Sequence, residues 1–148
     1  AIDGETSTSV TTERKQNNVE KSYIELCQLM QNKNEMDSSS FGIMLCFPGG
    51  RIISLNKTLL DKLGYDPADV FEVLERWEDV VHPEFYSQVV NQLTKLLRAP
   101  PAPRKSFRCK VGVRGKDGSK IMSDLFTCVV GGKNSAPVFS ISYLLFHE

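Results

Sequence analysis

The C-terminal third of the chain contains three strand-like segments joined by short turns, and this arrangement restricts the possible folds more than any other feature. The segments are Ser106 to Arg114, Lys120 to Val130 and Pro137 to Phe146. The first turn, Lys116 to Ser119, contains an Asp-Gly pair that favours a tight hairpin, and residues 131–136 form the second connection. Consecutive strands joined by such turns pair antiparallel, so the sequence predicts a three-stranded meander.

Apolar residues alternate along the first two of these segments, as they do on strands with one buried face. The alternation predicts that one face of the meander packs in the core and that the other is partly open. We expect a β-bulge near Asp124, where the alternation changes phase. The residues expected to alternate with this period are Phe107, Cys109, Val111, Val113, Met122, Leu125 or Phe126, Cys128 and Val130.

A β-hairpin and a capped helix are predicted upstream of the meander. The strand-like runs Phe41 to Phe47 and Arg51 to Leu55 flank Pro48-Gly49-Gly50, whose glycines supply the positive φ angles of a tight turn. Asn56 suits an N-cap because its side-chain oxygen can accept from a free backbone amide, and Gly64 is a typical C-terminal stop. A short helix is therefore expected between these two residues.

Two further helical segments are expected before the meander. Tyr65-Asp66-Pro67 opens a short one that ends near Glu75. His82-Pro83-Glu84 resembles the start of a longer one, because proline and an acidic residue both suit a first helical turn. This helix must end before the proline-rich segment Ala99 to Pro103. Its apolar stripe consists of Phe85, Val89, Val90, Leu93, Leu96 and Leu97.

The first forty residues are predicted to form a tail, an amphipathic helix and a linker. Residues 1–12 are rich in Ser and Thr and bury too little apolar surface to offset the entropy of ordering, so we expect a disordered tail. From Glu13 to Lys33 apolar residues recur at three- and four-residue spacings, which predicts a helix with one apolar stripe. The polar stretch Asn32 to Ser40 is expected to be a linker. The predicted division is therefore a tail (1–12), a flanking helix with linker (13–38) and a folded domain (39–148).

Composition narrows the classes of function. The 18 basic and 18 acidic residues cancel, so no global field favours nucleic acid or an anionic membrane. The longest apolar runs are strand-length and too short to span a membrane, and no catalytic constellation stands out. We therefore expect a soluble protein that is not an enzyme, makes no direct nucleic acid contact and does not enter a membrane.

The four cysteines are widely spaced, and three of them lie in apolar or alternating segments. With no Cys-x-x-Cys pair, a metal site is not expected. A free cysteine in such a segment behaves as a small buried hydrophobic residue. We expect reduced core cysteines, which suits a cytoplasmic or nuclear location.

Four short motifs, in this order, resemble landmarks of PAS domains. They are Gly49-Gly50-Arg51-Ile52-Ile53-Ser54-Leu55-Asn56, Leu63-Gly64-Tyr65 with Asp69-Val70, Val80-Val81-His82-Pro83-Glu84, and Gly115-Lys116-Asp117-Gly118-Ser119. The resemblance covers Phe41 to His147 and implies an α+β fold. In that fold a five-stranded antiparallel sheet, in the order 2-1-5-4-3, carries short helices that enclose a cavity on one face. Phe41 to Arg51 and Lys105 to Cys109 are also similar to PAS repeats of animal regulators such as Period or the basic helix-loop-helix PAS factors.

The cofactors of PAS relatives imply specific residues that can be sought here. Flavin photosensors of the family use a cysteine among the short helices, where this chain reads Val73 to Asp79 without one. A covalent flavin is thereby excluded, whereas a non-covalent flavin is not. Haem-binding relatives use an axial ligand, for which the candidates here are His82, His147, Cys46, Cys109 and Cys128. Because His82 is better explained as completing a helix start, no cofactor is expected, with haem or flavin as the alternative.

The leading interpretation is a regulatory PAS module that acts by protein–protein interaction in an intracellular signalling or transcription-regulating protein. Its helix stripe would remain exposed unless it covered this sheet or that of a partner, either a second copy or another PAS-containing protein. The alternative is a sensor that binds haem, flavin or another apolar ligand. A cavity filled by large side chains would favour interaction, and a ligand residue that faces the cavity would favour sensing. The residues expected at the interface are Val19, Tyr23, Leu26, Cys27, Met30, Phe107 and Tyr143.

Overall fold

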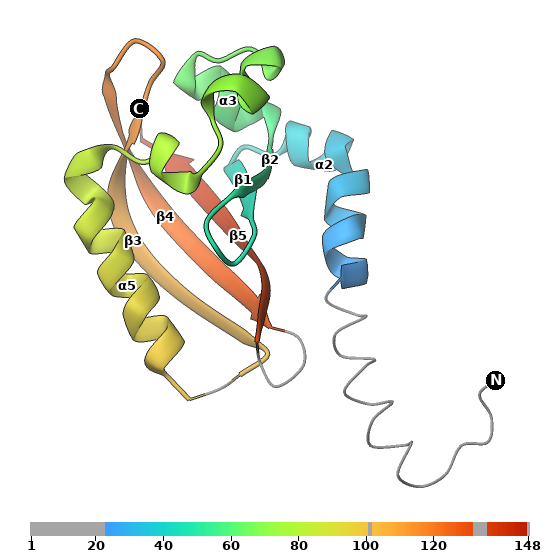
Figure 1. Cartoon of the computed structure of the whole chain (residues 1–148). Coiled ribbons are helices and arrows are strands. Elements are labelled where there is room, and N and C mark those ends of the chain that lie inside the picture. The colour runs from blue at the N-terminus through green and yellow to red at the C-terminus, as the bar shows by residue number, and fades with distance from the viewer. Residues whose placement is uncertain (1–22, 101, 132–135, 148) are drawn as a thin grey trace, which may run out of the picture.

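A five-stranded antiparallel sheet forms the centre of the computed structural model, which describes residues 23–100, 102–131 and 136–147 (Figure 1). The strand order is β2-β1-β5-β4-β3, which confirms the predicted topology. The strands are β1 (Gly42–Cys46), β2 (Ile52–Leu55), β3 (Arg104–Arg114), β4 (Lys120–Gly131) and β5 (Pro137–Phe146). The predicted tail and Val19 lie outside the described residues.

Most of the helices lie on one face of this sheet. The longest, α5 (Tyr86–Arg98), runs along β3, and shorter elements connect β2 to it (Figure 1). Lys105 on β3 fixes the C-terminal end of α5, because its Nζ donates to Leu96 O at 3.2 Å and to Ala99 O at 3.0 Å. The shorter elements are α3 (Lys57–Leu63), η1 (Pro67–Asp69), α4 (Val70–Val73), η2 (Trp77–Asp79) and η3 (Pro83–Phe85).

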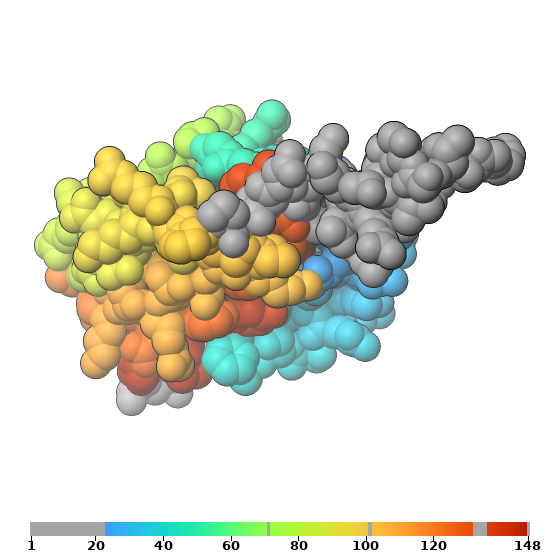
Figure 2. All heavy atoms as spheres, turned by 90° about the horizontal axis from the view of Figure 1, so that it is seen from below, coloured from blue at the N-terminus to red at the C-terminus, as the bar shows by residue number. Residues whose placement is uncertain are grey.

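The opposite face of the sheet is covered by the N-terminal helical segments. Residues 23–31 are helical and α2 (Lys33–Ser38) follows them. Leu26 and Met36 are buried there against Ile43 and Ile141 of the sheet. Figure 2 shows these N-terminal segments (blue) and α5 (yellow) on opposite sides of the strands (orange and red). At least part of the predicted helix stripe therefore packs within the chain.

The predicted caps of α3 are confirmed. Asn56 accepts from Leu59 N at 3.1 Å, as an N-cap should, and Gly64 ends the helix with a φ of 87°. The longer helix expected from His82 begins with the 3-10 turn η3 and continues as α5 up to Arg98, just before the prolines.

Two local predictions were wrong. The polar stretch expected to be a linker contains α2, because Met36 is buried in the core cluster under the sheet and thereby stabilises a short helix. The register of β3 and β4 is regular through Asp124, so no bulge occurs there. The irregularity in β4 falls between Val130 and Gly131, opposite Pro137, which has no N–H to continue the ladder.

Candidate functional site: an apolar cavity between the sheet and α5

A pocket of about 350 Å³ opens between the sheet, helix α5 and the β1–β2 loop. Its lining is mostly apolar, with far less polar than apolar surface. Along α5 it is lined by Val90, Leu93, Thr94 and Leu97, which fall on one helix face. Phe47 in the β1–β2 loop also lines the cavity. Because Phe47, Val90 and Leu97 are all exposed, apolar side chains surround the opening of the cavity.

The floor of the cavity contains a row of four residues from adjacent strands. Strand register places Met44 beside Ser142, Ser142 beside Thr127, and Thr127 beside Phe107. All four line the cavity. The hydroxyl oxygens of Thr127 and Ser142 are 2.8 Å apart, within hydrogen-bonding distance. A hydrogen-bonded polar pair therefore lies in a mainly apolar floor, to which Ser140 of β5 adds a further polar lining residue.

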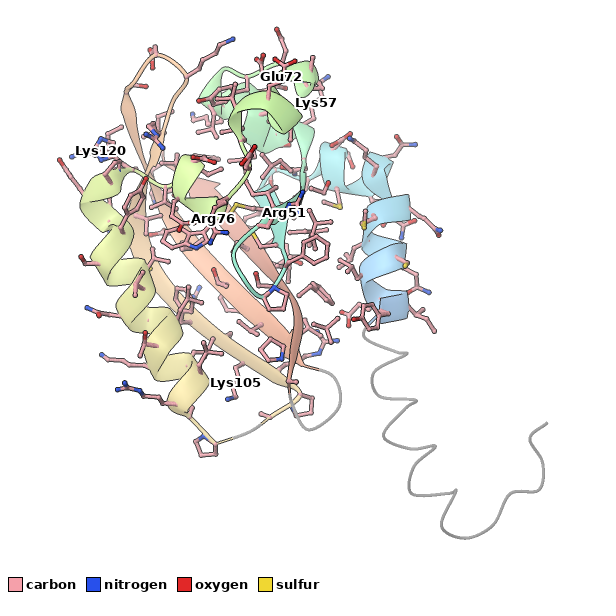
Figure 3. The ribbon with its side chains drawn as sticks, in the orientation of Figure 1. Arg51, Lys57, Glu72, Arg76, Lys105 and Lys120 are labelled. Carbon is pink, nitrogen blue, oxygen red and sulfur yellow. The ribbon has the colours of Figure 1, made fainter. Side chains whose placement is uncertain are left out.

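The β1–β2 loop is held over the cavity by the segment that contains Trp77. Arg76 Nη2 donates to Gly49 O at 2.6 Å, and Trp77 N donates to Gly50 O at 3.0 Å (Figure 3 labels Arg76). The Trp77 ring lines the cavity and packs edge-on against Tyr86 of α5, with ring centroids 5.7 Å apart. Hydrogen bonds to the carbonyl oxygens of Gly49 and Gly50 thus hold this wall in place.

Charge is almost absent from the cavity. Of the described residues that line it, none is Lys, Arg or His, and Glu78 alone is ionisable apart from Cys46. Glu78 Oε1 is shielded from solvent and makes no hydrogen bond within the described residues, although it forms an ion pair with Arg76 Nε at 3.4 Å. Burial, with a smaller contribution from Glu78, raises the pKa of the Cys46 thiol to about 12. Cys46 is therefore a neutral thiol at physiological pH.

The candidate haem ligands are largely placed elsewhere. His82 Nδ1 accepts from Glu84 N at 3.3 Å and caps η3, and His147 Nε2 lies 2.7 Å from Asp124 Oδ2. Cys128 packs in the cluster beneath the N-terminal helix. Only Cys46 of the five candidates lines the cavity, and within the described residues no group of three or more His, Cys, Asp or Glu could hold a metal ion.

The described residues that were predicted at an interface fall into four environments. Leu26 is buried against the sheet, whereas Tyr23, Cys27 and Met30 are exposed on the same helical segment. Phe107 is buried in the cavity floor.

Tyr143 is half-buried on the other sheet face. Its ring centroid lies 6.2 Å from that of Phe41 and 6.4 Å from that of Phe126. These three aromatic side chains form a group on the surface opposite the cavity.

Sequence reasoning missed the polar pair of the cavity floor. On β4 the residues that face the cavity are Leu125, Thr127 and Val129, while Met122 is exposed. The strict two-residue period of a strand, counted from Leu125, was the signal that could have placed Thr127 inside. Because a bulge was expected at Asp124, the sequence did not show which residues of β4 beyond it face inward.

The sequence comparisons agree with this architecture. Residues 52–144 match the model of a family described as PAS fold, and the chain belongs to this family. No curated protein matches it. No helix in the described part of the chain has the length and apolar character that crossing a membrane requires.

Several solved structures share the fold. The PAS domain of a protein from Colwellia psychrerythraea is 15% identical, covers 80% of this chain and 96% of its own, and has a TM-score of 0.66. The LOV protein of Rhodobacter sphaeroides is 14% identical over 82% of this chain and 68% of its own, with a TM-score of 0.63. A variant PAS-B domain of Drosophila melanogaster Cycle with bound glycerol is 14% identical over 72% and 99%, with a TM-score of 0.57. At these identities the likeness concerns the fold.

Proposed function

We propose that this PAS domain is a regulatory binding module, rather than an enzyme, that senses a small and mainly apolar molecule in its cavity. The observation that carries the proposal is the apolar pocket of about 350 Å³, one wall of which is held by hydrogen bonds to the β1–β2 loop. Pockets of this size and character are typical of small-molecule sites. A domain used for protein interaction alone would be expected to fill this space with large side chains.

The size and charge of the cavity favour a compact neutral ligand over haem or flavin. At the ~0.74 packing density of protein interiors, this volume holds about 13 carbon-sized atoms. Haem would also need an axial ligand, and Cys46 is the one of the five candidate ligands that lines the cavity. No cationic side chain among the described lining residues could pair with a phosphate or carboxylate.

Filling the cavity from α5 should abolish ligand binding. Thr94 lines the pocket, so in Thr94→Phe the added ring is expected to occupy the space of the ligand. With butylbenzene as probe, wild type should bind with a dissociation constant on the order of 0.1–1 mM, the range expected for ten apolar atoms. The variant should bind at least about tenfold more weakly by calorimetry.

Asn91→Phe is the matched control, because Asn91 is an exposed residue of the same helix. It should bind the probe like wild type. Failure of wild type to bind butylbenzene, or equal binding by Thr94→Phe, would contradict the sensor proposal.

A second function is favoured by exposed apolar side chains on the N-terminal helix. Leu26 packs on the sheet, yet Tyr23, Ile24 and Met30 remain 55%, 53% and 46% exposed. Exposed apolar surface of this kind is typical of interaction sites. We infer that this surface binds a second copy of the chain or another PAS-containing protein, within an intracellular signalling or transcription-regulating protein.

Placing charge on this surface should weaken self-association. The double variant Ile24→Glu/Met30→Glu is expected to shift sedimentation-velocity profiles towards monomer at concentrations where wild type is dimeric, with at least about tenfold weaker association. Deleting residues 1–38 would be less informative, because it also removes Met36 O, the partner of Asn56 Nδ2. Asn34→Glu, at an exposed residue of α2, is the control. A double variant that associates like wild type would refute the interface, and a wild type that is monomeric at every concentration would refute self-association through it.

A further inference from the structure

The polar pair in the cavity floor has a hydrogen that no group in the described part of the chain accepts. Thr127 and Ser142 are only 5% and 4% exposed, and their hydroxyls share one hydrogen bond of 2.8 Å. Two hydroxyl groups carry two protons, of which this bond uses one. Neither side chain makes another hydrogen bond within the described part of the chain. The second proton is therefore available for donation to whatever occupies the cavity.

The surroundings of the pair define the rest of the ligand. Phe107 lies beside Thr127 and Met44 beside Ser142 on the same cross-strand row, so apolar side chains flank the hydroxyls on both sides. A buried donor that is left without an acceptor costs about 1–3 kcal/mol, and one well-placed oxygen removes that cost. The ligand that fits has an apolar body and one hydrogen-bond acceptor.

On the basis of the proposed sensor function, we infer that the cavity selects small neutral carbonyl compounds whose oxygen accepts a hydrogen bond from the Thr127–Ser142 pair. A carbonyl oxygen suits the site because it accepts without bringing a donor of its own. It also adds no charge to a cavity in which Glu78, the one carboxylate among the described lining residues, is already 3.4 Å from Arg76. Either hydroxyl can donate, so the two residues act as alternatives.

Two isosteric probes test the inference. One is 4-phenylbutan-2-one, and the other is the alkene in which a terminal methylene group replaces its carbonyl oxygen. Wild type should bind the ketone about tenfold more tightly than the alkene by calorimetry, the effect expected of one buried hydrogen bond. Equal affinities for the two probes in wild type would overturn the inference while leaving the sensor function intact. Binding of neither probe would overturn both.

Three variants separate donation by the pair from a merely structural role. Thr127→Val and Ser142→Ala each leave one hydroxyl, so each should keep the preference for the ketone. The double variant, which removes both hydroxyls with little change of shape, should bind the two probes within about twofold of one another and should bind the alkene at least as tightly as wild type does. A double variant that retains a tenfold preference for the ketone would refute the assignment. Thermal unfolding checks that each variant is folded, and the comparison of probes in wild type decides the question if one is not.

Discussion

Replacing Asn56 with alanine is expected to lower the free energy of unfolding by about 3–5 kcal/mol, because this one side chain makes four hydrogen bonds, three of them buried and one partly buried. Asn56 is 1% exposed. Its Oδ1 accepts from Ile43 N at 2.8 Å and Leu59 N at 3.1 Å, and its Nδ2 donates to Met36 O at 2.6 Å and Phe41 O at 2.9 Å. Alanine would leave all four backbone groups without these partners.

The variants Asn56→Ser and Asn91→Ala show how much of the lost unfolding free energy is due to the hydrogen bonds of Asn56. Serine keeps an oxygen for the N-cap of α3 and should recover about 1 kcal/mol relative to alanine. Asn91 is exposed on α5, and its replacement by alanine should change stability by less than about 0.5 kcal/mol. Urea unfolding followed by circular dichroism measures all three. Similar midpoints for Asn56→Ala and Asn91→Ala would show that Asn56 does not join α2 to the domain.

Gly50→Ala is expected to destabilise the domain by about 2–4 kcal/mol, from backbone strain and from a steric clash. Gly50 has a φ of +95°, and a Cβ built there would lie 2.8 Å from Trp77 Cδ1 and 3.0 Å from Arg76 Nη2. The clash would displace Trp77, which lines the cavity. Weaker binding of butylbenzene should therefore accompany the loss of stability.

Two other glycines provide controls for this experiment. Gly118 also has a positive φ, of +87°, but a Cβ there would meet no atom within 4 Å, so Gly118→Ala should show only the strain, about 1 kcal/mol. Gly49 has neither feature, and its replacement should be nearly neutral. Thermal unfolding of the three alanine variants should rank them Gly50, Gly118, Gly49 in decreasing loss. Equal losses at Gly50 and Gly49 would contradict the close packing of the loop on Trp77.

Much of the fold could be predicted because its signals are local. The caps Asn56 and Gly64 fixed the limits of α3, and the prolines after Arg98 fixed the end of α5. The turn sequences predict which consecutive strands pair, but not how distant strands are ordered in the sheet, since pairing between distant strands leaves no local pattern. That order came from the resemblance to PAS domains. The sheet order was therefore an implication of the family and is confirmed by the structure.

The site was less predictable, because it depends on which face each strand presents. A shift of one residue exchanges the faces of a strand completely. Thr127 and Ser142 are polar and buried, so a search for apolar alternation passed over them, and Phe107 was assigned to an interface although it lines the cavity floor. The role of Met36 was missed for a similar reason. It is one apolar residue in a polar stretch, and its burial depends on the distant strands it packs against.

The most direct test of the account is a titration of the isotope-labelled domain with butylbenzene, followed by amide chemical shifts in NMR spectra. If the cavity is the sensing site, the largest shifts should occur at Leu93, Thr127 and Ser142 and at the Trp77 indole, all of which line it. Amides of the exposed N-terminal helix around Met30 should shift less. An absence of saturable shifts at the cavity residues, or saturable shifts confined to the outer face around Tyr143, would contradict the assignment of the cavity as a ligand site.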